Sequence, residues 1–377
     1  MIKIGFTGDF CPWERMESLY HNEKWKESLI EIKPYFDKND LNVIDLECPL
    51  TRHNEGITKT GPLIKSAPET VSILKWLNCK LVATANNHFK DYGNEGMQET
   101  FEVLSNNSIE WVGSGRNLSE AARTKIIQIN EFNIAIINMA ENEWSTTTGD
   151  QYGCHSLDAI DASKHINNAM IDADYVIMVI HGGHEHYNLP SPRMKKLYRF
   201  FVDMGADAVI GHHTHIFSGY EIYEGKPIFY SLGNFCFDWK GFQNSPWNTG
   251  LILRLILKGN SSIDFEYQFI EQNNSAPGVR PIEGNREEKL QHEIENLNRI
   301  IQHDDQLKNR FNEHVSKLKK TTMARLQPYK NRILTGLYTR GLFPDLLAEK
   351  KKLLLTNLIR CESHREVLLE ILKDLNK

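Results

Sequence analysis

Several features are missing from this sequence, and each absence narrows what the protein can be. No stretch approaches the roughly 18 uninterrupted apolar residues of a membrane-spanning helix, so none is expected. The N-terminus runs directly into a strand-like segment and has no basic region, apolar core or small-residue cleavage site of a signal peptide. We therefore expect a cytoplasmic protein without a transmembrane segment.

The cysteines and charges also lack the patterns of two protein classes. The six cysteines contain no CxxC pair, which favours reduced thiols over a disulfide framework (Cys11, Cys48, Cys79, Cys154, Cys236 and Cys361). The net charge of −5 gives no electrostatic reason to expect nucleic acid as a partner. With 40% hydrophobic and 25% charged residues, the composition is that of an ordinary globular protein.

Short apolar runs alternate with amphipathic stretches up to about Asn234. The runs predict strands at 2–7, 42–46, 80–83, 109–112, 133–138, 174–180 and 208–210. Helical patterns lie between several of them, at 22–32, 69–77, 95–105, 159–171 and 193–204. Four further strand-like segments, expected to be antiparallel, follow at 217–223, 227–230, 251–258 and 263–270. The fold class is therefore α/β, with two-layer or mixed β sheets flanked by helices.

The amino-acid composition of the chain changes near residue 285. Leu and Ile recur at helical spacing in 290–301, 307–318 and 367–375, among many Glu, Lys, Gln and Asn residues. The preceding segment contains Pro277, Gly278 and Pro281, which is typical of a linker. We predict a main domain at 1–271, a linker at 272–284 and an all-helical C-terminal extension at 285–377.

Polar residues that can bind metals follow five of the predicted strands. They are Asp9, the pair Asp45 and Glu47, the segment 86–91 (NNHFKD), the segment 181–186 (HGGHEH) and the segment 212–215 (HHTH). In open α/β sheets, sites form beyond the carboxyl ends of the strands. Carboxylate, amide and imidazole groups together suit a pair of divalent cations, which activate water as a nucleophile. His213 and His215, two apart on extended backbone, would face one site.

Each of these elements also has an ordinary structural interpretation. A single Asp after a strand is commonly a turn residue or a helix cap. The motif with Asn87 and His88 is compatible with turn chemistry alone. Histidines clustered around glycines have little structural use, however, and five such motifs in order favour a functional site.

The motifs and their order resemble those of the bacterial capsule-synthesis (CapA, poly-γ-glutamate) family, a branch of the calcineurin-like metallophosphoesterase fold. The matching stretches are TGDF (7–10), DLECPLT (45–51), ATANNHFKDYG (83–93), HGGHEH (181–186), GADAVIGHHTHIFSGYE (205–221) and IFYSLGNFCFD (228–238). The resemblance covers about residues 1–240 and does not include the C-terminal helices. It implies a calcineurin-like metallophosphoesterase fold for the main domain.

The resemblance also implies roles for individual residues. One or two divalent ions (Mn, Zn or Fe) would be held by Asp9, Glu47, Asn87, His181, His213 and His215. His88 would be the general acid or stabilise the transition state, Asp91 would orient it, and Glu185 would be a base or a further ligand. Lys65 and Asn234 would contact substrate.

Two positions depart from the wider fold's motifs. Cys11 stands where a histidine is usual, and Glu47 replaces the usual second aspartate. The sequence alone does not decide between His212 and His213 as the ligand.

The resemblance implies a metal-dependent hydrolase that cleaves a phosphoester or a γ-glutamyl amide in capsule or surface-polymer synthesis. Its substrate would be an anionic small molecule or polymer. The alternative is a non-catalytic assembly factor with a residual metal site. In either case the C-terminal helices offer a surface for a protein partner or self-association.

Overall fold

The computed structural model describes residues 1–21, 24–259, 262–329 and 331–360, and positions 364, 365, 367, 368, 371 and 372 near the C-terminus. The chain divides into two compact units, 1–309 and 310–377. Asn22, Cys361 and most of the predicted helix at 367–375 lie outside the described residues. The other five cysteines are free and buried, as expected for reduced thiols.

An eight-stranded mixed sheet forms one half of the first unit. Its strands lie in the order β16 (Val279–Pro281), β15 (Ile263–Gln272), β14 (Thr249–Leu257), β1 (Ile2–Cys11), β2 (Leu41–Leu46), β3 (Cys79–Ala83) and β4 (Glu110–Val112), and β13 (Asn234–Phe237) pairs with the end of β1. The strands from β1 to β4 are parallel, whereas β14, β15 and β16 are each antiparallel to their neighbours.

A six-stranded sheet forms the other half. Its order is β11 (Tyr220–Tyr223), β12 (Lys226–Phe229), β10 (Ala208–His212), β9 (Tyr175–His181), β7 (Phe132–Ala140) and β6 (Lys125–Ile129). The strands β5 (Ser114–Gly115) and β8 (Gly153–Cys154) form a separate short pair. The predicted antiparallel pairing is confirmed for β11 with β12 and for β14 with β15, whereas β12 pairs in parallel with the preceding strand β10. In this sheet β12 lies between β11 and β10, and it is antiparallel to β11 and parallel to β10.

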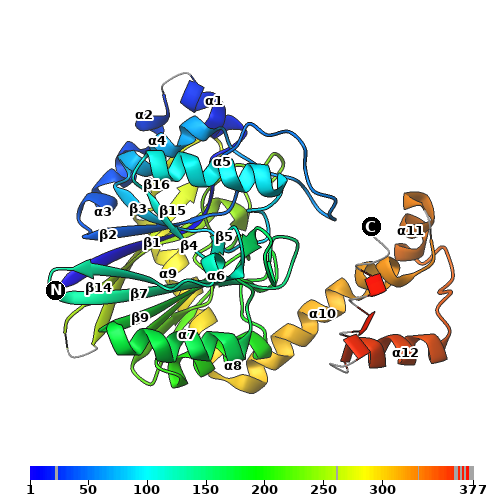
Figure 1. Cartoon of the computed structure of the whole chain (residues 1–377). Coiled ribbons are helices and arrows are strands. Elements are labelled where there is room, and N and C mark those ends of the chain that lie inside the picture. Colours follow the sequence, from blue (N-terminus) through cyan, green and yellow to red (C-terminus); the bar gives the residue numbers. More distant parts are fainter. Residues whose placement is uncertain are drawn as a thin grey trace. The chain divides into compact units, whose positions relative to one another are not determined.

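Helices cover the outer faces of the two sheets. Figure 1 shows α4 and α5 beside the first sheet and α7 and α8 beside the second, with the strands between them. The contacts agree, since α4 packs on β3, α7 on β7 and β9, and α8 on β10. The helices of this unit are α1 (Arg15–His21), α2 (Trp25–Leu29), α3 (Lys33–Asp37), α4 (Val71–Trp76), α5 (Gly93–Asn106), α6 (Leu118–Ala121), α7 (Ala159–Asp172), α8 (Pro192–Asp203) and α9 (Asn285–Gln302). The predicted α/β class with mixed sheets flanked by helices is confirmed.

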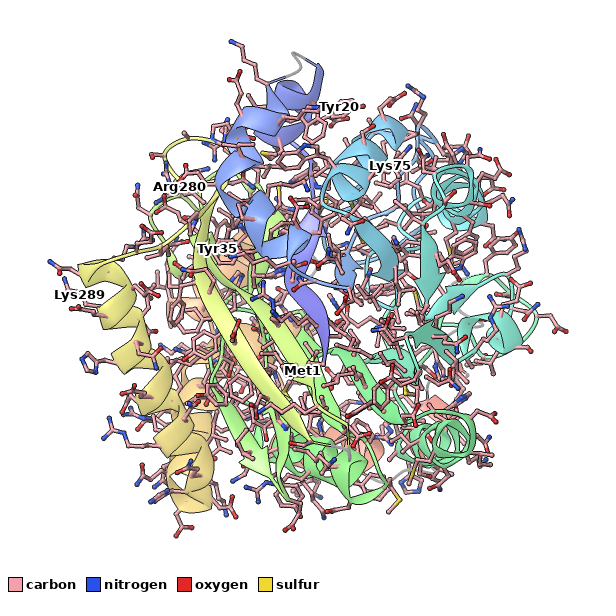
Figure 2. All side chains as sticks on the ribbon, turned by 90° about the vertical axis from the view of Figure 1, so that its left-hand side faces the viewer. Met1, Tyr20, Tyr35, Lys75, Arg280 and Lys289 are labelled. Carbon is pink, nitrogen blue, oxygen red and sulfur yellow. The ribbon has the colours of Figure 1, made fainter. Side chains whose placement is uncertain are left out.

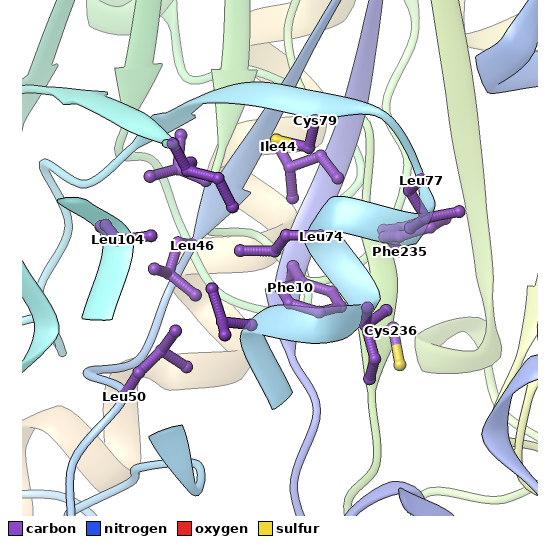
Figure 3. Packing of buried hydrophobic residues seen from close by; sticks show 14 of the residues in the cluster. Phe10, Ile44, Leu46, Leu50, Leu74, Leu77, Cys79, Leu104, Phe235 and Cys236 are labelled. Atoms are coloured by element: carbon purple, nitrogen blue, oxygen red, sulfur yellow. The ribbon is translucent and has the colours of Figure 1, made fainter. Parts of the chain in front are cut away.

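The core between the first sheet and its helices holds the strand ends in place. Figure 3 shows Phe10 of β1 and Phe235 of β13 packed with Leu46 of β2 and Leu74 of α4. The two phenyl rings lie 6.0 Å apart between centroids. Burial of each such side chain stabilises the fold by roughly 1.5–3 kcal/mol. This packing holds the ends of β1, β2 and β13 in place around Asp9.

A glycine lets β13 approach β1 at the functional end of the sheet. A Cβ added to Gly8 would lie 1.7 Å from the carbonyl oxygen of Gly233. The amide of Asp9 donates to that same carbonyl at 3.0 Å. The pairing of β1 shifts register next to Asp9 on both sides, toward β2 and toward β13. The predicted strand at 2–7 therefore continues through the site to Cys11.

The boundary between the units differs from the predicted domain boundary at 272–284. That segment includes β16, and α9 belongs to the first unit. Figure 2 shows α9, labelled at Lys289, running beside the strands. Asn298 accepts from the amide of Tyr220, and Gln291 accepts from the hydroxyl of Tyr267. Apolar residues on one face of α9 are buried, so the helix covers the edge of the sheet (Ile294, Leu297, Ile300 and Ile301).

The second unit is helical in its described part. It contains most of α10 (Asp304–Leu326), then α11 (Arg332–Thr339) and α12 (Glu349–Arg360). Many of its large apolar side chains are exposed, including Ile333 and Leu353. Among the residues that the structure describes, no helix is both long and apolar enough to cross a membrane.

Candidate metal centre

The carboxyl ends of the parallel strands from both sheets meet at one place. Asp9 of β1 pairs in register with Asp45 of β2, and His181 of β9 pairs with His212 of β10. All four side chains are buried. The sequence predicted this edge because each strand there ends in a polar residue, and parallel strands bring their carboxyl ends together.

Two clusters of possible metal ligands share Asp9. In the first, Asp9, Asp45 and His181 place one ligand atom each within 4.8 Å of the others, and Nδ1 of His181 lies 3.3 Å from Oδ2 of Asp45. In the second, Asp9, Glu47 and His215 do the same. The residues Asp9, Asp45, Glu47, His181 and His215 are called the Asp9 centre below.

His215 is held in the Asp9 centre by three contacts. Its Nδ1 lies 3.1 Å from Oδ2 of Asp9 and 3.0 Å from Oδ1 of Asn234. Its Nε2 lies 3.6 Å from Oε1 of Glu47. Asn234 also donates from Nδ2 to the carbonyl of Trp247 at 3.2 Å, which fixes the amide orientation. Asn234 therefore contacts a candidate ligand, whereas the sequence predicts a substrate contact.

Buried oxygens without hydrogen bonds indicate that the Asp9 centre fits cations. Both side-chain oxygens of Asp45 and of Glu47 lack a hydrogen-bond partner within the described part of the chain. Burial raises the pKa of Asp45 to about 8 and raises that of Glu47 well above its usual range, with the charge of Asp9 acting in the same direction. Unpaired buried carboxylates are strongly destabilising. Divalent cations bound by these oxygens and imidazoles would remove that penalty.

Asp9 behaves differently from its two carboxylate neighbours. Burial raises its pKa, but hydrogen bonds with His212 and His215 outweigh burial and lower the pKa below its usual range. Nδ1 of His212 lies 3.2 Å from Oδ1 of Asp9, and the amide of His213 donates to Oδ2 at 3.3 Å. Asp9 is therefore ionised and sits between the two clusters.

The backbone after β10 is not extended at His213 and His215, contrary to the prediction from the sequence. Both residues have positive φ, +89° for His213 and +59° for His215. β10 ends at His212, and the next residues turn. Such conformations cost about 1–3 kcal/mol in non-glycine residues and are concentrated at functional sites. The two imidazoles face the same site because the chain turns there.

Asn87 and His213 lie at the border of the first cluster. Oδ1 of Asn87 lies 3.0 Å from Nε2 of His181, and Nδ1 of His213 lies 3.2 Å from the same nitrogen. Nε2 of His213 lies 3.8 Å from a carboxylate oxygen of Glu143. His212 and His213 thus both reach the Asp9 centre, one against Asp9 and the other against His181.

His88 belongs to a buried charged network beside the Asp9 centre. Its Nδ1 lies 2.7 Å from Oδ2 of Asp91. The amine of Lys59 forms an ion pair with Asp91 and lies 3.3 Å from Nδ1 of His88. The amide of Ile64 donates to Asp91 at 2.9 Å. Burial lowers the pKa of His88 despite the opposing effect of Asp91.

The remaining predicted residues occupy different positions. Burial raises the pKa of Glu185, but His215 and His213 lower it more, so its carboxylate is ionised near them. The amine of Lys65 binds the carbonyl of His53 and Oδ1 of Asn54 and lies 4.5 Å from the ring centroid of Tyr92.

Cys11 is buried beside Phe237 in an apolar cluster. Burial raises the pKa of its thiol well above the usual value. Within the described ranges, neither ligand cluster of the Asp9 centre includes Cys11.

Sequence reasoning assigned no role to three residues of this region, Asp45, Lys59 and Glu143. Asp45 was among the polar residues at the strand ends, and its pairing in register with Asp9 places it in the site. Lys59 lies in an irregular loop and Glu143 follows β7 without a motif. Only the tertiary structure brings Lys59 to His88.

The comparisons with known proteins agree with the motifs. The family described as "Bacterial capsule synthesis protein PGA_cap" matches residues 3–239. The PGA biosynthesis protein CapA of Bacillus subtilis strain 168 is 29% identical over 284 residues, covering 74% of this chain and 73% of that protein. The capsule biosynthesis protein CapA of Bacillus anthracis is 28% identical over 294 residues, covering 76% and 71%.

Similarity to solved structures is weaker. A 5'-nucleotidase from Candida albicans aligns with a TM-score of 0.40 and 12% identity, over 84% of this chain and 57% of that chain. That level of similarity transfers no function. The match over residues 3–239 spans well over half of the chain. The chain therefore belongs to the bacterial capsule synthesis protein family PGA_cap.

Proposed function

We propose that the chain is a metal-dependent hydrolase that acts in the synthesis of a capsule or surface polymer of the poly-γ-glutamate type. The observation that carries the proposal is Asp9, an ionised carboxylate shared by two buried ligand clusters whose other carboxylates accept no hydrogen bond from any described residue. Mn, Zn and Fe all suit this set of oxygen and nitrogen ligands. When bound, two such cations lower the pKa of a water ligand and stabilise negative charge on a leaving atom.

The ligands proposed for the two cations come from both sheets. Asp45 and His181 would hold one cation and Glu47 and His215 the other, with Asp9 between them. Asn87 and His213 border the first cluster and complete its surroundings.

His88 is proposed to hand a proton to the leaving group. Its Nδ1 is occupied by Asp91, which leaves Nε2 as the nitrogen that can exchange a proton with a substrate. Lys59 fixes Asp91 from the other side. Glu185, ionised near His213 and His215, is a candidate base at the exposed side of the site.

The bond that would be cleaved is a phosphoester or a γ-glutamyl amide. Both reactions place negative charge on an oxygen next to the attacked atom, which bound cations stabilise. An anionic substrate would meet the cations themselves, because the Lys65 amine is bound by His53 and Asn54.

A second candidate is an assembly factor that does not turn over substrate. The exposed apolar side chains of α11 and α12 support it, since exposed apolar side chains are available to a protein partner (Ile333, Leu353, Leu354 and Ile359). This function would need those helices and would not need His88.

One experiment distinguishes the two candidates. The full chain, loaded in turn with Mn, Zn and Fe, is assayed on p-nitrophenyl phosphate, bis-p-nitrophenyl phosphate and γ-glutamyl-p-nitroanilide, beside its His88→Ala variant. The proposal expects metal-dependent turnover of one bond type, lost in His88→Ala at unchanged metal content. Activity without metal, or equal turnover in the variant, contradicts it. Capsule formation that survives His88→Ala but not removal of residues 310–377 would establish the assembly role.

A further inference from the structure

A second group of possible ligands lies away from the Asp9 centre. We propose that His155, Asp161 and His165 form a separate binding site for a zinc-class divalent cation that joins α7 to the segment after β8. The three residues place one ligand atom each within 4.8 Å of one another. Nε2 of His155 lies 2.8 Å from Oδ2 of Asp161, and Nε2 of His165 lies 3.8 Å from the same oxygen.

These separations suit a tetrahedral ion. Zinc bonds of about 2.0–2.1 Å to nitrogen and oxygen, arranged tetrahedrally, put neighbouring ligand atoms about 3.3–3.4 Å apart. The two distances to Oδ2 of Asp161 lie on either side of that value. Two imidazoles and one carboxylate leave a fourth position for water. Cobalt and nickel accept the same donors.

The local fold holds the ligands in place. Asp161 and His165 are four residues apart on α7, so they share one face of the helix. Asp158 caps that helix by accepting from the amides of Ile160 and Asp161.

His155 is fixed to the sheets by its backbone. Its amide donates to the carbonyl of Gly113 at 2.8 Å, and its carbonyl accepts from the amide of Ala140 at 2.9 Å. The backbone of His155 and the helix α7 would therefore both hold their ligands in fixed positions.

Both imidazoles have a further partner besides Asp161, as histidines that bind metals usually do. His155 makes a further hydrogen bond to the backbone of Asn138. Nδ1 of His165 lies 3.4 Å from Oγ1 of Thr124. Burial lowers the pKa of His155, so its ring is neutral at neutral pH, as a ligand must be.

The site is open to solvent and shares no residue with the Asp9 centre. The side chain of His155 is 2% exposed, but those of His165 and Asp161 are 23% and 40% exposed, so an ion can enter. The segment between Ala140 and His155 carries Glu143, which lies next to His213. A cation here would stabilise α7 and the base of that segment.

The test uses the full chain freed of metal by a chelator and titrated with zinc by calorimetry and thermal unfolding. The variants are Asp161→Asn and His165→Ala, both at accessible helix positions. His292→Ala is the matched control, because His292 and Glu295 form an exposed pair 3.7 Å apart on α9. Within the described residues no third ligand joins that pair.

The proposal expects wild type and His292→Ala to bind one zinc more per chain than Asp161→Asn or His165→Ala. It also expects the zinc-induced rise in Tm to shrink in those two variants only. Equal stoichiometry in all four proteins would overturn it. Filling of this site only with a large excess of zinc would overturn it as well. Manganese content at the Asp9 centre should not differ among the four.

Discussion

The Nδ1 atom of His88 lies 2.7 Å from Oδ2 of Asp91, and Lys59 holds the other oxygen of that carboxylate. All three side chains are at most 7% exposed. The arrangement directs Nε2 of His88 away from Asp91 and sets which nitrogen is available to a substrate. Lys59 and Asp91 are therefore positioning residues for His88.

The first prediction concerns this network. Asp91→Asn removes the charge that orients His88 but keeps the shape, and we expect turnover to fall by about 10²–10⁴-fold, the usual contribution of a general acid or base. Metal content should be unchanged. The measurement is kcat and KM together with metal analysis. A change in KM with kcat unchanged would contradict the positioning role of Asp91.

Lys59→Met gives a second test of the same network. It should destabilise the protein by roughly 3–5 kcal/mol, because it leaves the buried Asp91 charge without its cation. Chemical denaturation measures the effect, and Lys80→Met, at an exposed strand position, is the control.

The next prediction is that the effect of Glu47→Gln on stability changes sign when metal is removed. In chelated protein, Glu47→Gln should raise stability by about 1–3 kcal/mol, because burial raises the pKa of Glu47 and the folded state then carries the cost of that carboxyl at neutral pH. With metal present, the same variant should be less stable than wild type, since it loses a ligand. Denaturation with and without chelator measures both effects.

Glu221→Gln is the control for that experiment. Glu221 is buried but pairs with Arg199 and accepts from the hydroxyl of Tyr230. Its substitution should destabilise the protein equally in both states. Destabilisation of chelated protein by Glu47→Gln would show that the carboxylate has a partner other than a cation.

A further prediction concerns Gly8. An alanine there would bring its Cβ within 1.7 Å of the Gly233 carbonyl, so β13 would have to move away from Asp9. We expect a loss of about 3 kcal/mol, at the upper end of overpacking effects. Gly149→Ala is the control, because among the described residues nothing except its two chain neighbours lies within 4 Å of the added Cβ. Thermal unfolding compares the two, and equal Tm values would contradict the close approach.

The last stability prediction concerns pH and Glu271. Burial raises the pKa of Glu271, but hydrogen bonds from Arg286, Arg280 and Asn274 lower it more, to about 2. A carboxyl whose pKa is lower in the folded state stabilises the fold above its unfolded pKa of about 4.3 and loses that effect as the pH falls toward 2. Because both arginines are about half exposed, screening reduces the contribution to roughly 1–2 kcal/mol.

Glu271→Gln measures that contribution. The variant should be less stable than wild type at pH 7, and the difference should disappear between about pH 4.5 and pH 2. Chemical denaturation across this range provides the comparison. A difference that persists at pH 2 would mean that the ion pairs are not its source.

The sequence predicted the sheet edge of the site because strands and their polar ends are local features. Asp9 and His181 each follow or end an apolar run that only a buried strand explains. Asp45 was not assigned a role, although it lies on the same strand end as Glu47. The turns at His213 and His215 were not predicted, since positive φ in histidine has no sequence signal.

Features that depend on tertiary packing were harder to predict. Lys59 reaches His88 through an irregular loop, and no periodicity marks it. The helix α9 has the polar composition of an extension, yet one of its faces covers β11. Its amphipathic pattern gives a buried face but not the surface that buries it.

The most direct test of the account is the metal content of the full chain after loading with manganese and removal of free ion. Wild type is compared with Asp9→Ala, His181→Ala, His215→Ala and the exposed control Asp264→Ala. The account predicts that Asp9→Ala loses about two equivalents and that His181→Ala and His215→Ala lose about one each, because Asp9 alone belongs to both clusters. Equal metal content in wild type and Asp9→Ala would contradict the account.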